Sequence, residues 1–119
     1  MANWCSNIVI FHGEKIQVNR TMFLFKQLER KEKAEDKGQL PEFINADDGY
    51  FFEIWTLGNV LNYETRWSPN TDVLKQIADY FGVGFSYEYI EPMNGIHGKV
   101  NYHNGILTQT DRKYKTLKK

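Results

Sequence analysis

The chain has 119 residues, as many basic as acidic side chains, and a formal net charge of zero. A chain of this length buries a core as one domain without disulfides or a structural metal, and its single cysteine excludes an internal disulfide framework. Zero net charge provides no overall field toward nucleic acid or membrane surfaces, and an aromatic fraction of 15% argues against disorder.

The same totals indicate where the protein acts. The N-terminus lacks a basic segment followed by an apolar run, so we expect no signal peptide. Every apolar run is far shorter than the roughly 20 residues that cross a bilayer. A lone cysteine suits a reducing compartment. We therefore predict a cytoplasmic protein without membrane contact, with one domain over 1–114 and a basic C-terminal tail over 115–119.

The N-terminal half predicts one strand, one helix and a loop. A continuous apolar run predicts a central strand over 6–13. A helix is expected over 19–38, with Asn19 as its N-cap and Gly38 as its terminator. Its charged second half has the composition of a solvated face rather than an interaction tail. The loop over 39–50 follows. The apolar stripe of the helix comprises Met22, Phe25 and Leu28.

A hairpin and a second helix are predicted next. Residues 50–57 and 60–67 form two strands around a Gly58-Asn59 turn. The second strand alternates, which places Leu61, Tyr63, Thr65 and Trp67 on one face. The helix over 68–82 has Ser68 and Pro69 at its start and Gly82 at its end.

Three more strand candidates complete the chain. Residues 83–91 alternate, with Val83, Phe85, Tyr87 and Tyr89 on one face. Residues 97–105 and 106–114 are joined by an Asn104-Gly105 turn. The order of elements predicts an α+β, ferredoxin-like βαββαβ core with two helices on one face of an antiparallel sheet and one or two extra C-terminal strands. We expect the aromatic excess to fill the core and to form a platform on the other face.

Few residues suggest reaction chemistry. Cys5 is the only thiol, and no catalytic spacing links it to His12, His97 or His103. A nucleophilic cysteine needs a nearby base and a lowered pKa, so we expect Cys5 to be buried and inert. The closely spaced Cys or His pairs typical of zinc sites are missing. We predict no metal and no cofactor, and a surface position for His97.

The roles of two groups of carboxylates allow more than one interpretation. Asp47 and Asp48 precede Gly49, which is typical of a turn, although such carboxylates also suit a hard cation; we favour the turn. Register decides whether the strand glutamates meet as a pair, and the sequence leaves this open for Glu53, Glu64, Glu88 and Glu91. Residues 81–89 match only part of the RNA-recognition signature and follow the second helix, so we reject that motif.

Three stretches carry a family resemblance. "NWCSN" (3–7) leads straight into an apolar strand, and "YETRWSPN" (63–70) and "FSYEYIEPMNGIHG" (85–98) follow in order. Together they resemble the YubB, or ferredoxin-like, family of phage- and plasmid-borne proteins of unknown function. The chain departs from that family where "TLGNVLNYE" stands in place of a Trp-Gly-rich segment. The resemblance implies a ferredoxin-like fold and a mobile-element origin, but no reaction.

The resemblance also favours a structural role for the opening motif. Trp4 is expected to pack against the sheet or a helix end, and Cys5 to behave as a small buried hydrophobe. The polar side chains around them are expected to satisfy backbone groups at the strand entrance, namely Asn3, Ser6 and Asn7.

We predict a non-enzymatic protein-binding module of a phage or plasmid that acts on a host protein. Its specific version is an inhibitor of a host defence system, such as a CRISPR or nuclease system. Small size, the aromatic excess and the lack of a catalytic constellation motivate it, since exposed Tyr and Trp are good interface anchors. A homodimer through the same face is an alternative that hides the same side chains. The predicted protein contacts are Trp55, Tyr87, Tyr89 and Tyr102.

Two other functions remain as alternatives. A nucleic-acid-binding accessory protein of a mobile element would combine aromatic stacking with a basic C-terminal segment. The zero net charge weighs against it. A small enzyme of unknown reaction would use Glu64, Asp47 or a histidine, although no spacing supports one. The basic residues are Arg112, Lys113, Lys115, Lys118 and Lys119.

Overall fold

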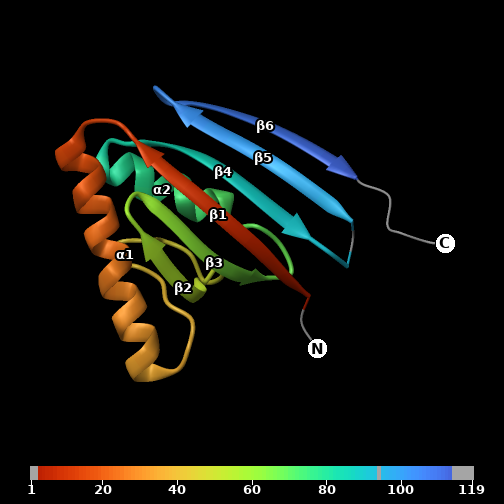
Figure 1. The fold of residues 1–119 in the computed structure, drawn as a ribbon, viewed down its shortest axis with the longest axis horizontal. Coiled ribbons are helices and arrows are strands. Elements are labelled where there is room, and N and C mark those ends of the chain that lie inside the picture. Colours follow the sequence, from red (N-terminus) through yellow and green to blue (C-terminus); the bar gives the residue numbers. More distant parts are fainter. Residues whose placement is uncertain (1–2, 94, 114–119) are drawn as a thin grey trace.

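The computed structural model describes residues 3–93 and 95–113. Its strands form one antiparallel sheet in the order β2-β3-β1-β4-β5-β6 (Figure 1). The elements in chain order are β1 (Trp4–His12), α1 (Lys15–Glu35), β2 (Phe52–Leu57), β3 (Val60–Arg66), α2 (Thr71–Phe81), β4 (Gly84–Glu91), β5 (Ile96–His103) and β6 (Ile106–Lys113).

The first six elements confirm the predicted βαββαβ arrangement. Strands β2-β3-β1-β4 are ordered as in a ferredoxin-like fold, with β1 between β3 and β4. Two extra strands, β5 and β6, then continue the sheet beyond β4 as a hairpin. Their turn lies at Asn104-Gly105 as predicted, and both residues have positive φ (53° and 78°), the conformation of a two-residue hairpin turn.

Both helices lie on one face of the sheet, which we call the covered face (Figure 1). Phe11 of β1 stacks on Phe25 of α1, with 5.7 Å between ring centroids, and Phe25 meets Phe51 edge-on at 5.2 Å. We call the opposite side the open face, since both helices lie on the covered face (Figure 1). The fully buried core includes Val9, Phe11, Phe25, Leu61, Leu74, Ile77 and Phe85.

Both helices differ from the prediction at their ends. Helix α1 begins at Lys15 after Glu14, because Val18 continues the buried stripe toward the N-terminus, and Asn19 is therefore not its cap. It ends before Asp36, which takes the left-handed conformation (φ 56°) that short acidic side chains tolerate, so Gly38 is not its terminator. Helix α2 begins after Asn70 instead of Ser68.

Other local predictions are confirmed with one exception. Gly82 ends α2 in the left-handed conformation, and the alternation of β4 buries Phe85, Tyr87 and Tyr89 together. In the stretch after β3 the pattern breaks, because Trp67 has a φ of 71° and turns its indole outward. Trp67 therefore does not share the covered face with Leu61, Tyr63 and Thr65.

The charged half of α1 does more than face solvent, which corrects the prediction. The Glu32 carboxylate accepts hydrogen bonds from the backbone N–H groups of Glu53 (2.7 Å) and Ile54 (2.9 Å). Strand β2 has a register shift there, and Glu53 has a φ of 52°. The carboxylate thus satisfies two N–H groups that the irregular strand leaves without ladder partners.

Candidate functional site

Large apolar side chains gather on the open face. Ile8 and Ile10 of β1 lie there because their neighbours Val9 and Phe11 point into the core. In the register, Leu57 is opposite Val60, and Val60 is opposite Ile10. We call the following set the apolar patch; each side chain is between 39% and 65% exposed: Trp4, Ile8, Ile10, Trp55, Leu57 and Ile90.

One end of the patch carries a cation between two rings. Trp4 and Phe52 meet edge-on, with centroids 5.1 Å apart. The Arg66 guanidinium lies 5.6 Å from the Trp4 ring centre and 4.9 Å from that of Phe52. Trp4 therefore packs on the sheet, as predicted, but from its open side. Arg66 has no carboxylate partner among the described residues.

The other half of the open face is polar. The Glu88 carboxylate lies 3.5 Å from the His97 ring nitrogen and 3.6 Å from the Lys99 ammonium. Ser86 donates a hydrogen bond to Asn101 at 2.9 Å. His97 is a partly exposed residue, as predicted. An apolar centre bordered by polar groups is the usual anatomy of a protein–protein interface.

The structure separates the predicted contact residues. Trp55 lies on the open face and is 54% exposed. Tyr87, Tyr89 and Tyr102 are only 1%, 2% and 5% exposed on the covered face, so the prediction that they form the platform is wrong. The reason is the two-residue period of β4 and β5, in which these tyrosines share a face with Phe85.

Sequence reasoning missed most of the apolar patch. It treated residues 6–13 as apolar on both faces, although alternate positions of this strand face opposite sides. With Val9 assigned to the core, Ile8 and Ile10 follow as open-face residues. Ile90 follows in the same way from Tyr89.

Two residues of the opening motif, Cys5 and Asn7, are buried, as predicted for Cys5. Cys5 is fully buried, and burial, the largest effect, raises the pKa of its thiol to about 11 despite a hydrogen bond with Thr65. The Asn7 amide donates to the carbonyl groups of Cys5 (2.9 Å) and Tyr63 (3.3 Å) and to the Thr65 hydroxyl (3.2 Å). Asn7 thereby satisfies backbone groups, whereas Ser6 lies exposed.

All three resembling stretches meet in this buried network. Tyr87 donates to the Asn7 side-chain oxygen. Tyr63 donates to Asn70 at 2.6 Å, and the Asn70 amide donates to the Gly49 carbonyl at 3.0 Å. Burial raises the pKa of both tyrosines well above their usual range, which keeps their hydroxyl groups as donors. The network therefore gives these motifs a shared packing role.

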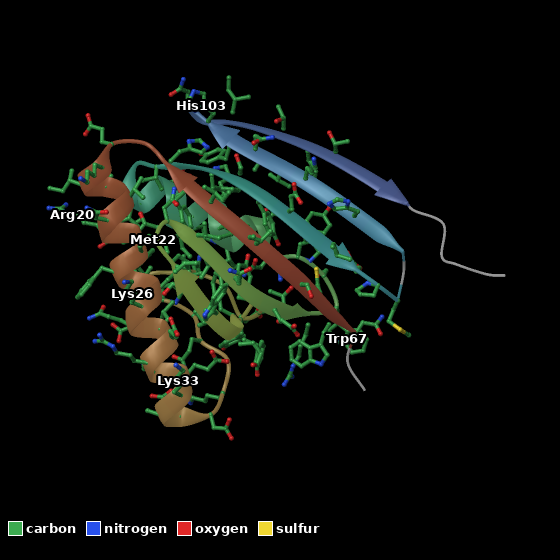
Figure 2. All side chains as sticks on the ribbon, in the orientation of Figure 1. Arg20, Met22, Lys26, Lys33, Trp67 and His103 are labelled. Atoms are coloured by element: carbon green, nitrogen blue, oxygen red, sulfur yellow. The ribbon has the colours of Figure 1, made fainter. Side chains whose placement is uncertain are left out.

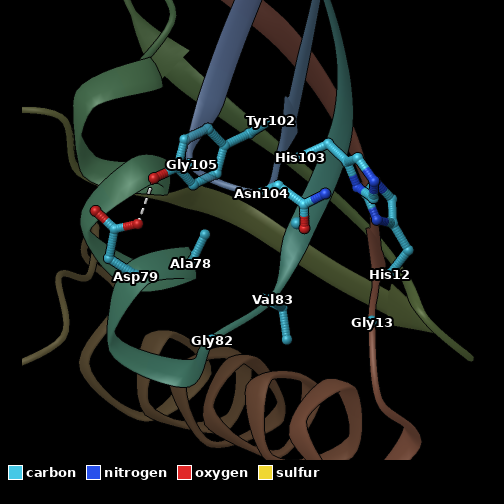
Figure 3. A pocket seen from close by; sticks show the side chains of 11 residues that line it. His12, Gly13, Ala78, Asp79, Gly82, Val83, Tyr102, His103, Asn104 and Gly105 are labelled. Carbon is cyan, nitrogen blue, oxygen red and sulfur yellow. Dashed lines mark hydrogen bonds between the residues drawn. The ribbon is translucent and has the colours of Figure 1, made fainter.

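A polar cavity of about 380 Å³ lies at the end of the sheet next to α2 (Figure 3). Figure 3 shows the rings of His12 and His103 close together, with centroids 5.7 Å apart. Across the cavity, Tyr102 donates a hydrogen bond to Asp79, which also pairs with Lys75 at 3.1 Å. The Tyr102 hydrogen bond, followed by the Lys75 contact, lowers the pKa of Asp79.

The other candidate groups are dispersed. Glu64 lies opposite Ser6, whereas Glu88 lies opposite Ile8, so the register does not set these carboxylates as a pair. Asp48 precedes Gly49, whose φ of 85° confirms a bend there. Within residues 3–93 and 95–113, no group of three or more His, Cys, Asp or Glu side chains is placed to hold a metal ion.

The predicted nucleic-acid contacts lie mostly beyond the structure. The backbone of Arg112 and Lys113 forms the end of β6. Lys115, Lys118 and Lys119 lie outside the described residues, as does the predicted tail over 115–119.

Comparison with known proteins identifies a domain type. A family model described as "Ferredoxin-like domain in Api92-like protein" matches residues 50–117. No curated protein and no solved structure matches the chain significantly. Neither described helix has the length and apolar character needed to cross a membrane.

Proposed function

We propose that this chain, which belongs to the family of ferredoxin-like domains in Api92-like proteins, is a non-enzymatic protein-binding module. The apolar patch is its binding surface. The observation that carries the proposal is the exposure of two indoles and four aliphatic side chains on the sheet face opposite both helices (Figure 1). Trp anchors at the centre of a desolvated contact supply much of the binding energy in protein interfaces.

The charges around the patch favour a protein over a nucleic acid. A protein that binds single-stranded nucleic acid needs aromatic platforms beside a cationic groove. Here Lys99 is paired with Glu88, and Arg66 is the cation that borders the patch without a carboxylate partner in the described chain. The partner that fits is a folded protein with an apolar surface and a carboxylate that reaches Arg66.

The specific version is a cytoplasmic phage- or plasmid-borne inhibitor that covers a functional surface of a host defence protein. The resemblance of the three motifs to mobile-element proteins supports it. A small domain without reaction chemistry can act by occupying such a surface, because a standard interface needs only about 800 Å² from each partner.

The test is affinity capture from a bacterial host lysate, with and without nuclease treatment, read by mass spectrometry, with matched variants. Trp55→Glu and Leu57→Glu place a charge in the patch at solvent-exposed positions, and Met93→Glu places the same charge at an exposed apolar position outside the patch. We expect one stoichiometric protein that binds the wild type and Met93→Glu, and that both patch variants lose. A captured protein that the patch variants retain would contradict the proposal.

Two further outcomes would assign the patch or the chain differently. Light scattering that shows a wild-type dimer, which Trp55→Glu converts to a monomer, would assign the patch to a second copy of this chain. Retention that disappears with nuclease, and on removal of residues 112–119, would instead support the nucleic-acid alternative, with the salt dependence expected of phosphate contacts.

A further inference from the structure

Helix α1 has a second apolar surface that the core does not use. Phe25 points into the core and is fully buried, whereas Phe23 is 60% exposed. Two residues apart on a helix differ by about 200° in direction, so Phe23 faces away from the sheet. Ile16, seven residues earlier on the same side, is equally exposed. A helix that only covered a core would carry polar residues there.

This surface is one side of a groove. Two adjoining cavities of about 460 and 540 Å³ lie along α1 and share Leu24, Gln27 and Phe43 among their lining residues. Phe43, from the segment that follows α1, stacks on Tyr80 of α2 with ring centroids 3.9 Å apart. Phe81 meets Phe43 edge-on at 6.1 Å. The groove therefore has α1 as one wall and an aromatic cluster as the other.

The charges along the groove are mainly positive. Arg20, Arg30 and Lys31 line it, and Glu42 is the acidic residue among the lining side chains. Figure 2 shows Arg20 on the side of α1 that faces away from the sheet. None of these four side chains forms an ion pair within the described chain. The three cations are thus free to pair with a ligand.

We propose that this groove binds an acidic amphipathic helix of a partner protein. The stripe from Ile16 to Lys31 is about 22 Å long at 1.5 Å per residue, which matches a helix of about four turns. Apolar side chains at i, i+3 or i+4 and i+7 of the ligand would fill the two cavities, as in other helix-in-groove complexes. Glu or Asp on its flanks would pair with Arg20, Arg30 and Lys31, which sets both affinity and polarity.

Other occupants fit less well. A nucleic acid needs a continuous cationic track, whereas the middle of this groove is lined by Phe23, Leu24 and Phe43. A membrane surface also combines apolar and anionic groups, but it is met by protruding side chains rather than by two hollows. The groove lies on the helix side of the molecule, so this inference is independent of the apolar patch on the open face.

The test is selection of peptide ligands without a designed bias. A displayed library of random peptides of about 16 residues, which matches the groove length, would be selected on the wild-type protein, with counter-selection on the bare support only. We expect enriched sequences with net negative charge and an apolar period of three to four residues. Failure to enrich any peptide, or enrichment of basic or non-amphipathic ones, would overturn the proposal.

An enriched peptide, labelled and followed by fluorescence anisotropy, separates the groove from the patch. We expect Arg30→Glu/Lys31→Glu and Phe23→Ala to bind the peptide at least about tenfold more weakly than the wild type does. Trp55→Glu should bind it with unchanged affinity. The opposite pattern would place the peptide on the patch and overturn the groove assignment while leaving the proposed function intact. Co-sedimentation with anionic phosphatidylglycerol vesicles that Phe23→Ala abolishes would assign the groove to a membrane surface instead.

Discussion

The Tyr87 hydroxyl donates a hydrogen bond to the side-chain oxygen of Asn7, across a separation of 80 residues in the sequence. This bond joins the middle strand β1 to β4 inside the covered face. Because the Asn7 amide also reaches Tyr63 and Thr65 of β3, a single side chain connects three adjacent strands. A buried polar group with all its partners fixes one register, since a shifted strand would leave it unsatisfied.

Removing either partner of this bond should destabilise the fold, and Asn7 should matter more. We expect Asn7→Ala to lower the free energy of unfolding by about 2–4 kcal/mol, because it leaves several buried groups without partners. Tyr87→Phe should cost about 1 kcal/mol. In urea titrations the double variant should cost less than the sum of the two. Additive effects would show that the bond is not formed, and the exposed neighbour Ser6→Ala provides the control.

Cys5 should resist thiol reagents in the native state. Its side chain is fully buried and its thiol pKa is raised to about 11, so thiolate is scarce at pH 8. We expect iodoacetamide to modify the protein only at the rate at which it unfolds, and to react at once in guanidinium chloride. Mass spectrometry over time measures this. Rapid stoichiometric alkylation of folded protein at pH 8 would contradict the buried, inert assignment.

The Glu32 carboxylate should stabilise the irregular part of β2. Glu32→Gln keeps one acceptor oxygen but turns an amide toward the N–H groups of Glu53 and Ile54. We expect a loss of about 1.5–3 kcal/mol in unfolding free energy, the usual scale for hydrogen bonds to charged groups. Hydrogen exchange at these two amides should speed up. Glu14→Gln, which alters a cap residue without a side-chain hydrogen bond, should leave the unfolding free energy and the exchange rates of these two amides near the wild-type values.

Gly98 should not tolerate a side chain. Tyr89 is its cross-strand partner, and a Cβ at residue 98 would lie 2.0 Å from the Tyr89 ring. The ring passes over this glycine, and its hydroxyl accepts a hydrogen bond from Gln109 at 3.0 Å. We expect Gly98→Ala to cost about 1–3 kcal/mol, as overpacking does. Thermal unfolding in a Tyr89→Leu background should show a smaller cost; an equal cost would mean that the ring is not the obstacle.

Asp79 should make stability depend on acid pH. Its folded-state pKa is lowered, so its contribution is complete above the unfolded pKa, near pH 4, and disappears as pH falls through the folded value. We expect the wild type to exceed Asp79→Asn in stability at pH 6 and this gap to close toward pH 3. The difference in stability should stay below about 1 kcal/mol, because the ion pair of Asp79 with Lys75 is solvent-exposed.

The fold was predictable because its signals are local. Alternation in β3 and β4, the Asn104-Gly105 turn and the Gly82 terminator each follow from a few neighbouring residues, and the order of elements then limits the topology to very few arrangements. Helix ends were less predictable. Glu32 illustrates why, since its role depends on a strand irregularity that only the folded register creates.

The candidate site was less predictable because it depends on which face the helices cover. Alternation groups Tyr87 and Tyr89 with Phe85, but it does not say that this group lies under α2. Ile8 and Ile10 on the opposite face belong to a continuous apolar run, and such a run is typical of a strand that is buried on both faces. The Asn7 network could not be predicted, because its partners are 56 to 80 residues away.

The central position of β1 also sets how the chain can fold. Its two neighbours, β3 and β4, are about 55 and 80 residues further along, so β1 has no sheet partner until most of the chain is present. Folds dominated by such non-local pairing reach the native state in milliseconds to seconds, because loop closure precedes the stabilising contacts. During synthesis, β1 therefore has both edges unpaired until β3 and β4 emerge, and its apolar run is open to aggregation over that interval.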